Sequence, residues 1–75
     1  MTVTLNREKL RATRKEKELT QEELAEHSAI SDRYVRSLET GAAEPSASVL
    51  YRISRTLEVP MDELITMTAE ERDVR

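Results

Sequence analysis

The stretch from Leu19 to Gly41 constrains the fold of this chain more than any other part of the sequence. It carries two helix-start signals, Thr20 and Ser31, whose hydroxyls can accept hydrogen bonds from free helix N–H groups. Glu23 lies three residues after Thr20 and can bond back to the cap's own N–H, which completes a capping box. Gly41 is a natural helix stop. The stretch therefore predicts two short helices joined by a tight turn, at residues 21–27 and 32–40.

Three more helices are expected around this pair. Asn6 can cap a first helix, and Ser46 can cap a fourth whose apolar residues recur along one helix face. Pro60 breaks the chain before a short fifth helix. With one glycine, two prolines and a strongly charged composition, the sequence predicts an all-α, compact five-helix domain. The expected helices are 7–17, 21–27, 32–40, 47–57 and 61–66, within one domain over 1–67, and a short tail follows over 68–75.

The composition argues against several kinds of site. Without cysteine there is no disulfide framework and no thiolate, and the single histidine, His27, lacks partners for a metal site. No nucleophile is paired with a base, and no glycine-rich phosphate loop is present, so we expect no enzyme activity, no cofactor and no small-molecule ligand. No apolar run is long enough for a membrane span or a signal peptide, so a cytoplasmic protein is expected.

The formal net charge of −3 argues against a nucleic-acid binder, but the charges are unevenly distributed. Residues 1–17 carry six Lys/Arg and two acids, whereas residues 18–40 carry two Arg and six acids. The acids of the second block cluster in its first expected helix, while Arg33 and Arg36 stand in the second. One surface can therefore be basic while the far side is acidic. Non-specific DNA binding should still be weaker than for a basic domain.

Two short helices meeting at an angle are the geometry of a helix-turn-helix, whose second helix can enter the DNA major groove. The chain resembles the phage-repressor and Cro-like helix-turn-helix family, which includes small transcriptional repressors and restriction–modification controller proteins. The resemblance covers about residues 5–65. Its motifs are Leu10-Arg11-x-x-Arg14, Leu19-Thr-Gln-Glu-Glu-Leu-Ala25, Ile30-Ser31, Tyr34-Val35, Leu38-Glu39-x-Gly41, Pro45-Ser46, Leu50, Leu57 and Met61-x-x-Leu64.

The resemblance implies a lambda-repressor-like fold and a homodimer on near-palindromic double-stranded DNA. It also assigns roles to individual residues. Gln21 matches an anchor for a DNA phosphate at a helix N-terminus, where free N–H groups and the helix dipole favour an anion. The positions that read base edges are matched by Asp32, Arg33 and Ser37. The positions at the groove edge and in the following loop, which meet the DNA backbone, are matched by Tyr34, Arg36 and Thr40.

Several of these residues have two interpretations. Arg33 either donates two hydrogen bonds to a guanine edge, worth about 1–3 kcal/mol of discrimination, or is a solvated surface arginine. Arg36 is either a DNA contact, with phosphate favoured over base, or a solvated arginine. Asp32 either accepts from a cytosine amino group, caps its helix, or holds Arg33 or Arg36. Tyr34 either contacts the DNA backbone or packs at the edge of the core.

The resemblance also gives structural expectations. Arg14 and Glu39 match an ion pair that ties the first helix to the end of the third. Glu18, Ala29 and Glu58 stand where relatives usually have glycine, at helix ends that often adopt the left-handed conformation. A side chain disfavours that conformation by roughly 1–2 kcal/mol, so either the chain is less stable than its relatives or these turns close differently.

The apolar C-terminal edge has two interpretations, as core or as a dimer interface. Its residues are Met61, Leu64, Ile65 and Met67. Taken together, the sequence predicts a dimeric, sequence-specific DNA-binding regulator of transcription, a repressor or controller protein located in the cytoplasm at the nucleoid. The alternative is a protein-interaction module of the same fold, such as an antitoxin-like component or an adaptor, which the low net basicity keeps open.

Overall fold

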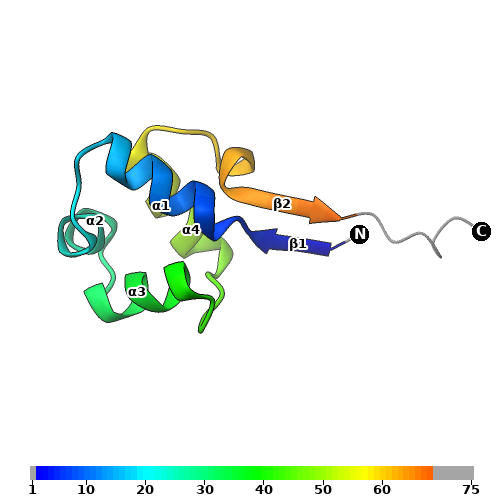
Figure 1. Ribbon diagram of the computed structural model, residues 1–75, viewed down its shortest axis with the longest axis horizontal. Helices are drawn as coiled ribbons and strands as arrows, with labels where there is room; N and C mark the ends of the chain where they lie inside the picture. The colour runs from blue at the N-terminus through cyan, green and yellow to red at the C-terminus, as the bar shows by residue number, and fades with distance from the viewer. Residues whose placement is uncertain (1, 69–75) are drawn as a thin grey trace, which may run out of the picture.

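The computed structural model describes residues 2–68. Four α-helices and a short 3-10 helix pack around one core, and strands from the two ends of the chain pair beside it (Figure 1). The elements are β1 (Thr2–Leu5), α1 (Arg7–Glu16), α2 (Gln21–Ser28), α3 (Asp32–Thr40), α4 (Ala47–Leu57), the 3-10 helix η1 (Met61–Leu64) and β2 (Ile65–Thr68).

Side-chain caps set the starts of the four α-helices, as predicted. In each case an oxygen of the cap accepts a hydrogen bond from the backbone N–H three residues later, at 3.0–3.2 Å. The caps are Asn6, Thr20, Ser31 and Ser46. The capping box is also confirmed, because Glu23 Oε1 accepts from Thr20 N at 2.9 Å. Local sequence therefore fixes where these helices begin.

The three turns that lack the expected glycine keep the left-handed conformation. Glu18, Ala29 and Glu58 have φ angles of 59°, 60° and 60°. The prediction left open whether such turns would close differently, and they do not. Each side chain is exposed, so it meets no crowded core, but the backbone preference of roughly 1–2 kcal/mol per residue still opposes the turn.

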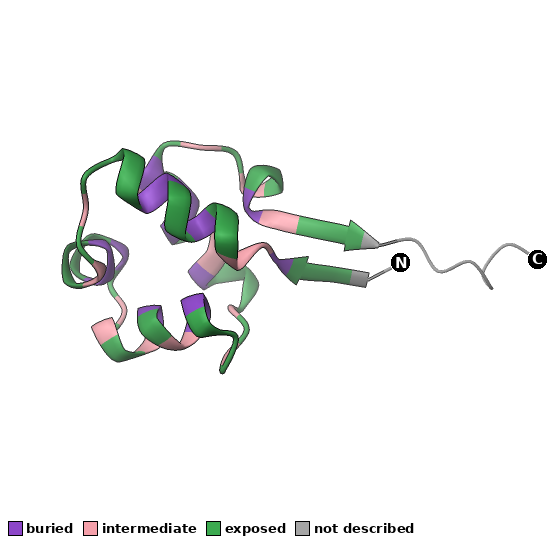
Figure 2. Ribbon diagram, in the orientation of Figure 1, coloured by how far each residue is buried: buried purple, intermediate pink, exposed green. Residues whose placement is uncertain are grey.

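The core lies where the four α-helices and η1 meet, and every element except β2 contributes a buried apolar side chain (Figure 2). Leu10 of α1, Leu24 of α2 and Leu38 of α3 are fully buried. Ile53 of α4 and Leu64 of η1 are equally inaccessible. Because α2 and α3 bury one face each, their opposite faces are left to solvent.

The predicted fifth helix over 61–66 is not formed, so the five-helix count is wrong, whereas the mostly helical fold is confirmed. The chain makes one 3-10 turn over Met61–Leu64 and then forms β2, which pairs antiparallel with β1. The sequences Thr-Val-Thr-Leu and Ile-Thr-Met-Thr alternate apolar residues with β-branched threonines, which suits a strand better than a helix. We call this strand pair the terminal ribbon. It projects beyond the helical body (Figure 1).

Only the first residue of the predicted tail over 68–75 lies within the described part of the chain. Thr68 is the last residue of β2, and residues 69–75 lie outside the described part of the chain. None of the helices formed by residues 2–68 is long and apolar enough to cross a membrane.

Candidate nucleic-acid interface

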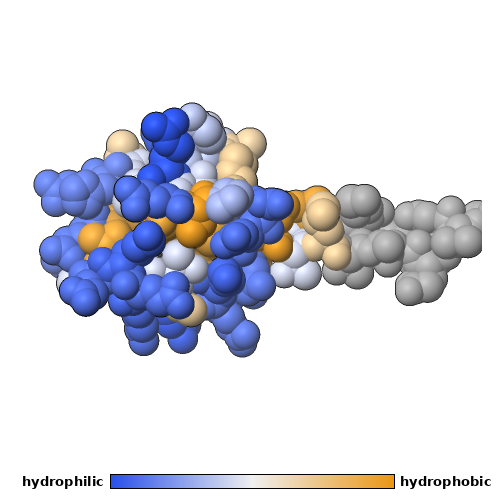
Figure 3. All heavy atoms as spheres, turned by 90° about the horizontal axis from the view of Figure 1, so that it is seen from above, coloured by the Kyte–Doolittle hydropathy of each residue, from blue (hydrophilic) through white to orange (hydrophobic). Residues whose placement is uncertain are grey.

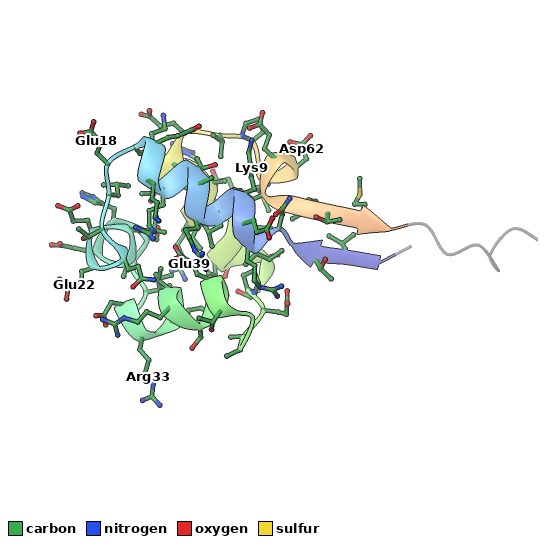
Figure 4. The ribbon with its side chains drawn as sticks, in the orientation of Figure 1. Lys9, Glu18, Glu22, Arg33, Glu39 and Asp62 are labelled. Atoms are coloured by element: carbon green, nitrogen blue, oxygen red, sulfur yellow. The ribbon has the colours of Figure 1, made fainter. Side chains whose placement is uncertain are left out.

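The outward face of α3 carries most of the residues predicted to meet DNA. The helix turns Val35, Leu38 and Glu39 into the body, so its polar residues lie on the opposite side. Figure 4 shows Arg33 pointing away from the body, on the side of α3 that faces away from α1. Exposed positions on this helix are Arg33, Arg36 and Thr40, and the half-buried ones are Asp32, Tyr34 and Ser37.

Arg33 is the arginine of this face that has no acceptor among residues 2–68, whereas Arg36 is paired with Asp32. Its side chain is exposed, and no residue among 2–68 accepts a hydrogen bond from its guanidinium. All five N–H donors of the group are therefore available to a ligand, in the planar fork that matches two acceptors side by side.

Asp32 and Arg36 form an ion pair on the same helix. Asp32 Oδ2 lies 3.0 Å from Arg36 Nη2, and the two side chains remain 38% and 53% exposed. Ser31 caps α3, which leaves Asp32 free of that role. Of the three interpretations of Asp32, the structure therefore supports the ion pair in the free protein. Exposed pairs at this spacing contribute only about 0.3–0.5 kcal/mol, so a stronger ligand can separate them.

Tyr34 has a structural partner. Its ring is half-buried against the core, and its hydroxyl donates to the backbone oxygen of Glu44 at 3.2 Å. It thereby ties the first turn of α3 to the loop before α4. The end of α3 is fixed by Ser37, whose backbone oxygen accepts from Gly41 N at 3.0 Å and from Thr40 Oγ1 at 3.3 Å.

The buried carboxylate of Glu39 connects the helices behind this surface. Its side chain is 2% exposed and lies between α1 and α3 (Figure 4). Arg14 Nε donates to Glu39 Oε2 at 2.7 Å, and Arg14 Nη2 donates to Oε1 at 3.1 Å. Gln21 Nε2 also donates to Oε1, at 3.1 Å. One carboxylate therefore joins α1, the start of α2 and the last turn of α3, and it orients the amide of Gln21.

Two arginines of α1 border this surface, and sequence reasoning assigned them no role. Arg11 Nη2 donates to the backbone oxygen of Glu39 at 3.4 Å, and Arg7 Nη2 lies 3.3 Å from Glu44 Oε2. Both line an open groove of about 680 Å³ between α1, β1 and the end of α3, which also includes Thr40. The available signal was the excess of cations in residues 1–17. Local patterns could not show that these cations reach the end of α3.

The predicted dimer residues do not form one exposed set. Leu64 is fully buried in the core of its own chain, so its assignment to a dimer surface is wrong. A partner could reach it only by opening the core. Met61 and Ile65 are half-buried, and Met67 is 59% exposed.

Known proteins share both the sequence and the shape of this chain. Residues 10–64 match the sequence profile of a family described as Helix-turn-helix. The chain is 44% identical over 57 residues to y4dJ of Sinorhizobium fredii, an uncharacterized helix-turn-helix-type transcriptional regulator, covering 76% of this chain and 74% of y4dJ.

Two solved structures are also similar. The restriction–modification controller protein C.AhdI from Aeromonas hydrophila has a TM-score of 0.74 at 30% identity, over 76% of this chain and 86% of that one. The DNA-binding domain of the P22 C2 repressor has a TM-score of 0.74 at 27% identity, over 83% of this chain and 82% of that one. Sequence and structure agree, and the chain belongs to the helix-turn-helix family.

Proposed function

We propose that this protein is a sequence-specific, double-stranded DNA-binding regulator of transcription, a repressor or controller protein that acts as a dimer on a near-palindromic operator. The observation that carries the proposal is the outward face of α3, where Arg33 stands free on a helix fixed at both ends by caps and by Glu39. The names of the relatives, a controller protein and a repressor's DNA-binding domain, support the same class of function.

In this proposal the start of α2 binds a DNA phosphate. Gln21 is the first residue of α2, where free backbone N–H groups and the helix dipole favour an anion. Glu39 accepts one N–H of the Gln21 amide and leaves the other for a phosphate oxygen. The buried carboxylate thus sets the orientation of an amide that would otherwise rotate freely, which lowers the entropy lost on binding.

In this proposal α3 lies in the major groove, and its residues contact the edges of the bases. Arg33 can donate two hydrogen bonds to the O6 and N7 atoms of guanine, and Ser37 lies one turn further along the same helix. Arg36 is within reach of a phosphate once it leaves Asp32, and the freed carboxylate can then accept from a cytosine amino group. Thr40, at the end of α3, completes the contact with the backbone.

The charge pattern sets how strongly the DNA should attract this surface. The loop after α3 has no Lys or Arg between Gly41 and Ser46, so few phosphates are neutralised. Each neutralised phosphate contributes a slope of about −0.9 in log K against log salt concentration. We therefore expect a salt slope shallower than that of strongly basic DNA-binding domains, with a larger share of the affinity coming from base contacts.

The same proposal assigns the protein no catalytic step, no cofactor and no small-molecule ligand, and it places the protein at the nucleoid in the cytoplasm. The domain responsible is residues 1–67. A second candidate is a protein-interaction module of the same fold. The observation that favours it is the exposed acidic side of α2, formed by Glu22, Glu23 and Glu26, which would suit a basic protein partner.

Selection from a pool of random duplexes tests the proposal. We expect enrichment of a near-palindrome whose half-sites are centred about 10–10.5 base pairs, roughly 34 Å, apart. If no duplex is enriched over the pool at low salt, the proposal fails, and the protein-interaction candidate becomes the better account.

A further inference from the structure

The terminal ribbon carries an apolar face out of the core and into solvent. Leu5 pairs with Ile65 and Val3 pairs with Met67, so these four side chains share one face of the two strands. Leu5 is buried and Ile65 half-buried, whereas Val3 and Met67 are 54% and 59% exposed. Along the ribbon, burial therefore declines with distance from the body while the side chains remain apolar.

This face continues into an open groove against α4. The groove encloses about 290 Å³ between the ribbon and the start of α4. Leu50 and Met61 line it together with residues of the ribbon face. Figure 3 shows hydrophobic residues gathered where the ribbon leaves the body. The ribbon face and the groove form one surface, which we call the ribbon surface.

The ribbon surface is almost free of charge, in a chain with 36% charged residues. Residues 2–5 and 64–68 include no Lys, Arg, Asp or Glu. The one charged residue that lines the groove is Glu44, which Arg7 holds at 3.3 Å. Natural proteins usually protect an isolated ribbon with charges, and two strands alone are marginally stable in water. The absence of such protection indicates that another apolar surface covers this one.

We propose that the ribbon surface is the interface through which two copies of this chain associate. An uncharged, apolar surface is complementary to a second copy of itself, whereas contact through other faces would oppose blocks of like charge. Residues 69–75 of the same chain would cover the ribbon surface poorly, because five of these seven residues are charged. In Figure 1 the ribbon leaves the body to one side of α3, so a two-fold axis that passes through the ribbon parallel to the direction in which α3 faces would leave both α3 helices on the same side of the dimer. This inference rests on the proposed function, which requires such a dimer.

Sedimentation of the full chain without DNA tests the interface. We expect the unaltered chain to be a dimer, and Met67→Glu to weaken dimerisation by about 100-fold or more, because two carboxylates would be buried near the axis. The matched control is Thr66→Glu, which places the same charge on the opposite face of the same strand and should leave dimerisation within about threefold. A monomeric unaltered chain, or equal effects of both substitutions, would overturn the proposal.

A second measurement covers the case in which Met67→Glu disturbs folding. The chain has no cysteine, so Met67→Cys allows a single spin label to be attached on the ribbon surface. We expect strong dipolar coupling between the labels of two copies. A label at Glu22→Cys, at the far end of the body from the ribbon (Figure 4), should show much weaker coupling. Stronger coupling at Glu22 than at Met67 would place the interface elsewhere.

The outcomes separate this inference from the function on which it rests. If duplex selection enriches an operator but Met67→Glu still forms dimers normally, the ribbon surface is not the interface and the DNA-binding function stands. If no duplex is enriched, the function fails whatever the oligomeric state.

Discussion

Replacing Arg14 with methionine should remove a large part of the stability of this domain. The side chain of Arg14 is 10% exposed and that of Glu39 is 2% exposed, so the pair is shielded from water. Arg14→Met removes three hydrogen bonds, two to the Glu39 carboxylate and one from Nη1 to the backbone oxygen of Leu19 at 2.9 Å. Glu39 would keep only the amide of Gln21 and the half-exposed Arg11, whose Nε is 3.7 Å away.

The magnitude follows from leaving a buried carboxylate without its main partner. Breaking a buried pair in this way costs about 3–5 kcal/mol. For a chain of this length the total free energy of unfolding is about 4–11 kcal/mol. The melting temperature should fall by about 12–40 °C, since each kcal/mol corresponds to about 4–8 °C in domains of this size.

Urea and thermal unfolding, followed by circular dichroism, measure this effect. The matched control is Lys17→Met, which breaks an exposed pair with Glu58 at 3.5 Å and should cost less than about 1 kcal/mol. The double variant Arg14→Met with Glu39→Leu should recover more than half of the loss, because no buried charge remains. The reasoning is refuted if Arg14→Met costs no more than Lys17→Met, or if the double variant is less stable than Arg14→Met alone.

Three further predictions concern turns and caps. Ala29→Gly and Glu58→Gly should each stabilise the fold by about 0.5–1 kcal/mol, since relief of the left-handed strain outweighs the flexibility of glycine; urea midpoints that fall instead would contradict this. Gly41→Ala should destabilise it by more than about 1 kcal/mol, because φ is +91° and the new Cβ would lie 3.1 Å from the Arg7 guanidinium; an unchanged melting temperature would argue against this. Thr20→Ala should cost about 1 kcal/mol and speed amide exchange in the first turn of α2, and unchanged exchange would count against the capping box.

Local chemistry explains why the helices could be predicted so well. The limits of α3 and α4 match the structure because Ser31 and Ser46 signal their starts and Gly41 or the end of the apolar pattern signals their ends. These signals act within a few residues of chain, so a single sequence displays them. The same reasoning predicted the left-handed turn sites but could not decide how a chain without glycine would close them. Only the backbone geometry of Ala29 answers that question.

The terminal ribbon was missed because its cause is not local. Leu5 and Ile65 pair across 60 residues of sequence, and each strand is too short to be predicted from its own residues. The alternation in Ile-Thr-Met-Thr spans only four residues, and the stretch after Pro60 was interpreted from the sequence as a short helix. The same limit applies to the site. The sequence identified the face of α3, whereas the contacts of Arg7 and Arg11 with that end of the body depend on how α1 packs.

The measurement that tests the central claim most directly is the base preference of Arg33→Ala on the selected duplex. Binding should be measured to that duplex and to duplexes with each base pair changed in turn. The matched control is Arg52→Ala, which removes an exposed arginine from α4, outside the proposed interface. We predict that Arg33→Ala weakens binding by about 1–3 kcal/mol and abolishes discrimination at one position, while Arg52→Ala preserves the whole profile. Equal, sequence-independent losses for the two variants would contradict the account.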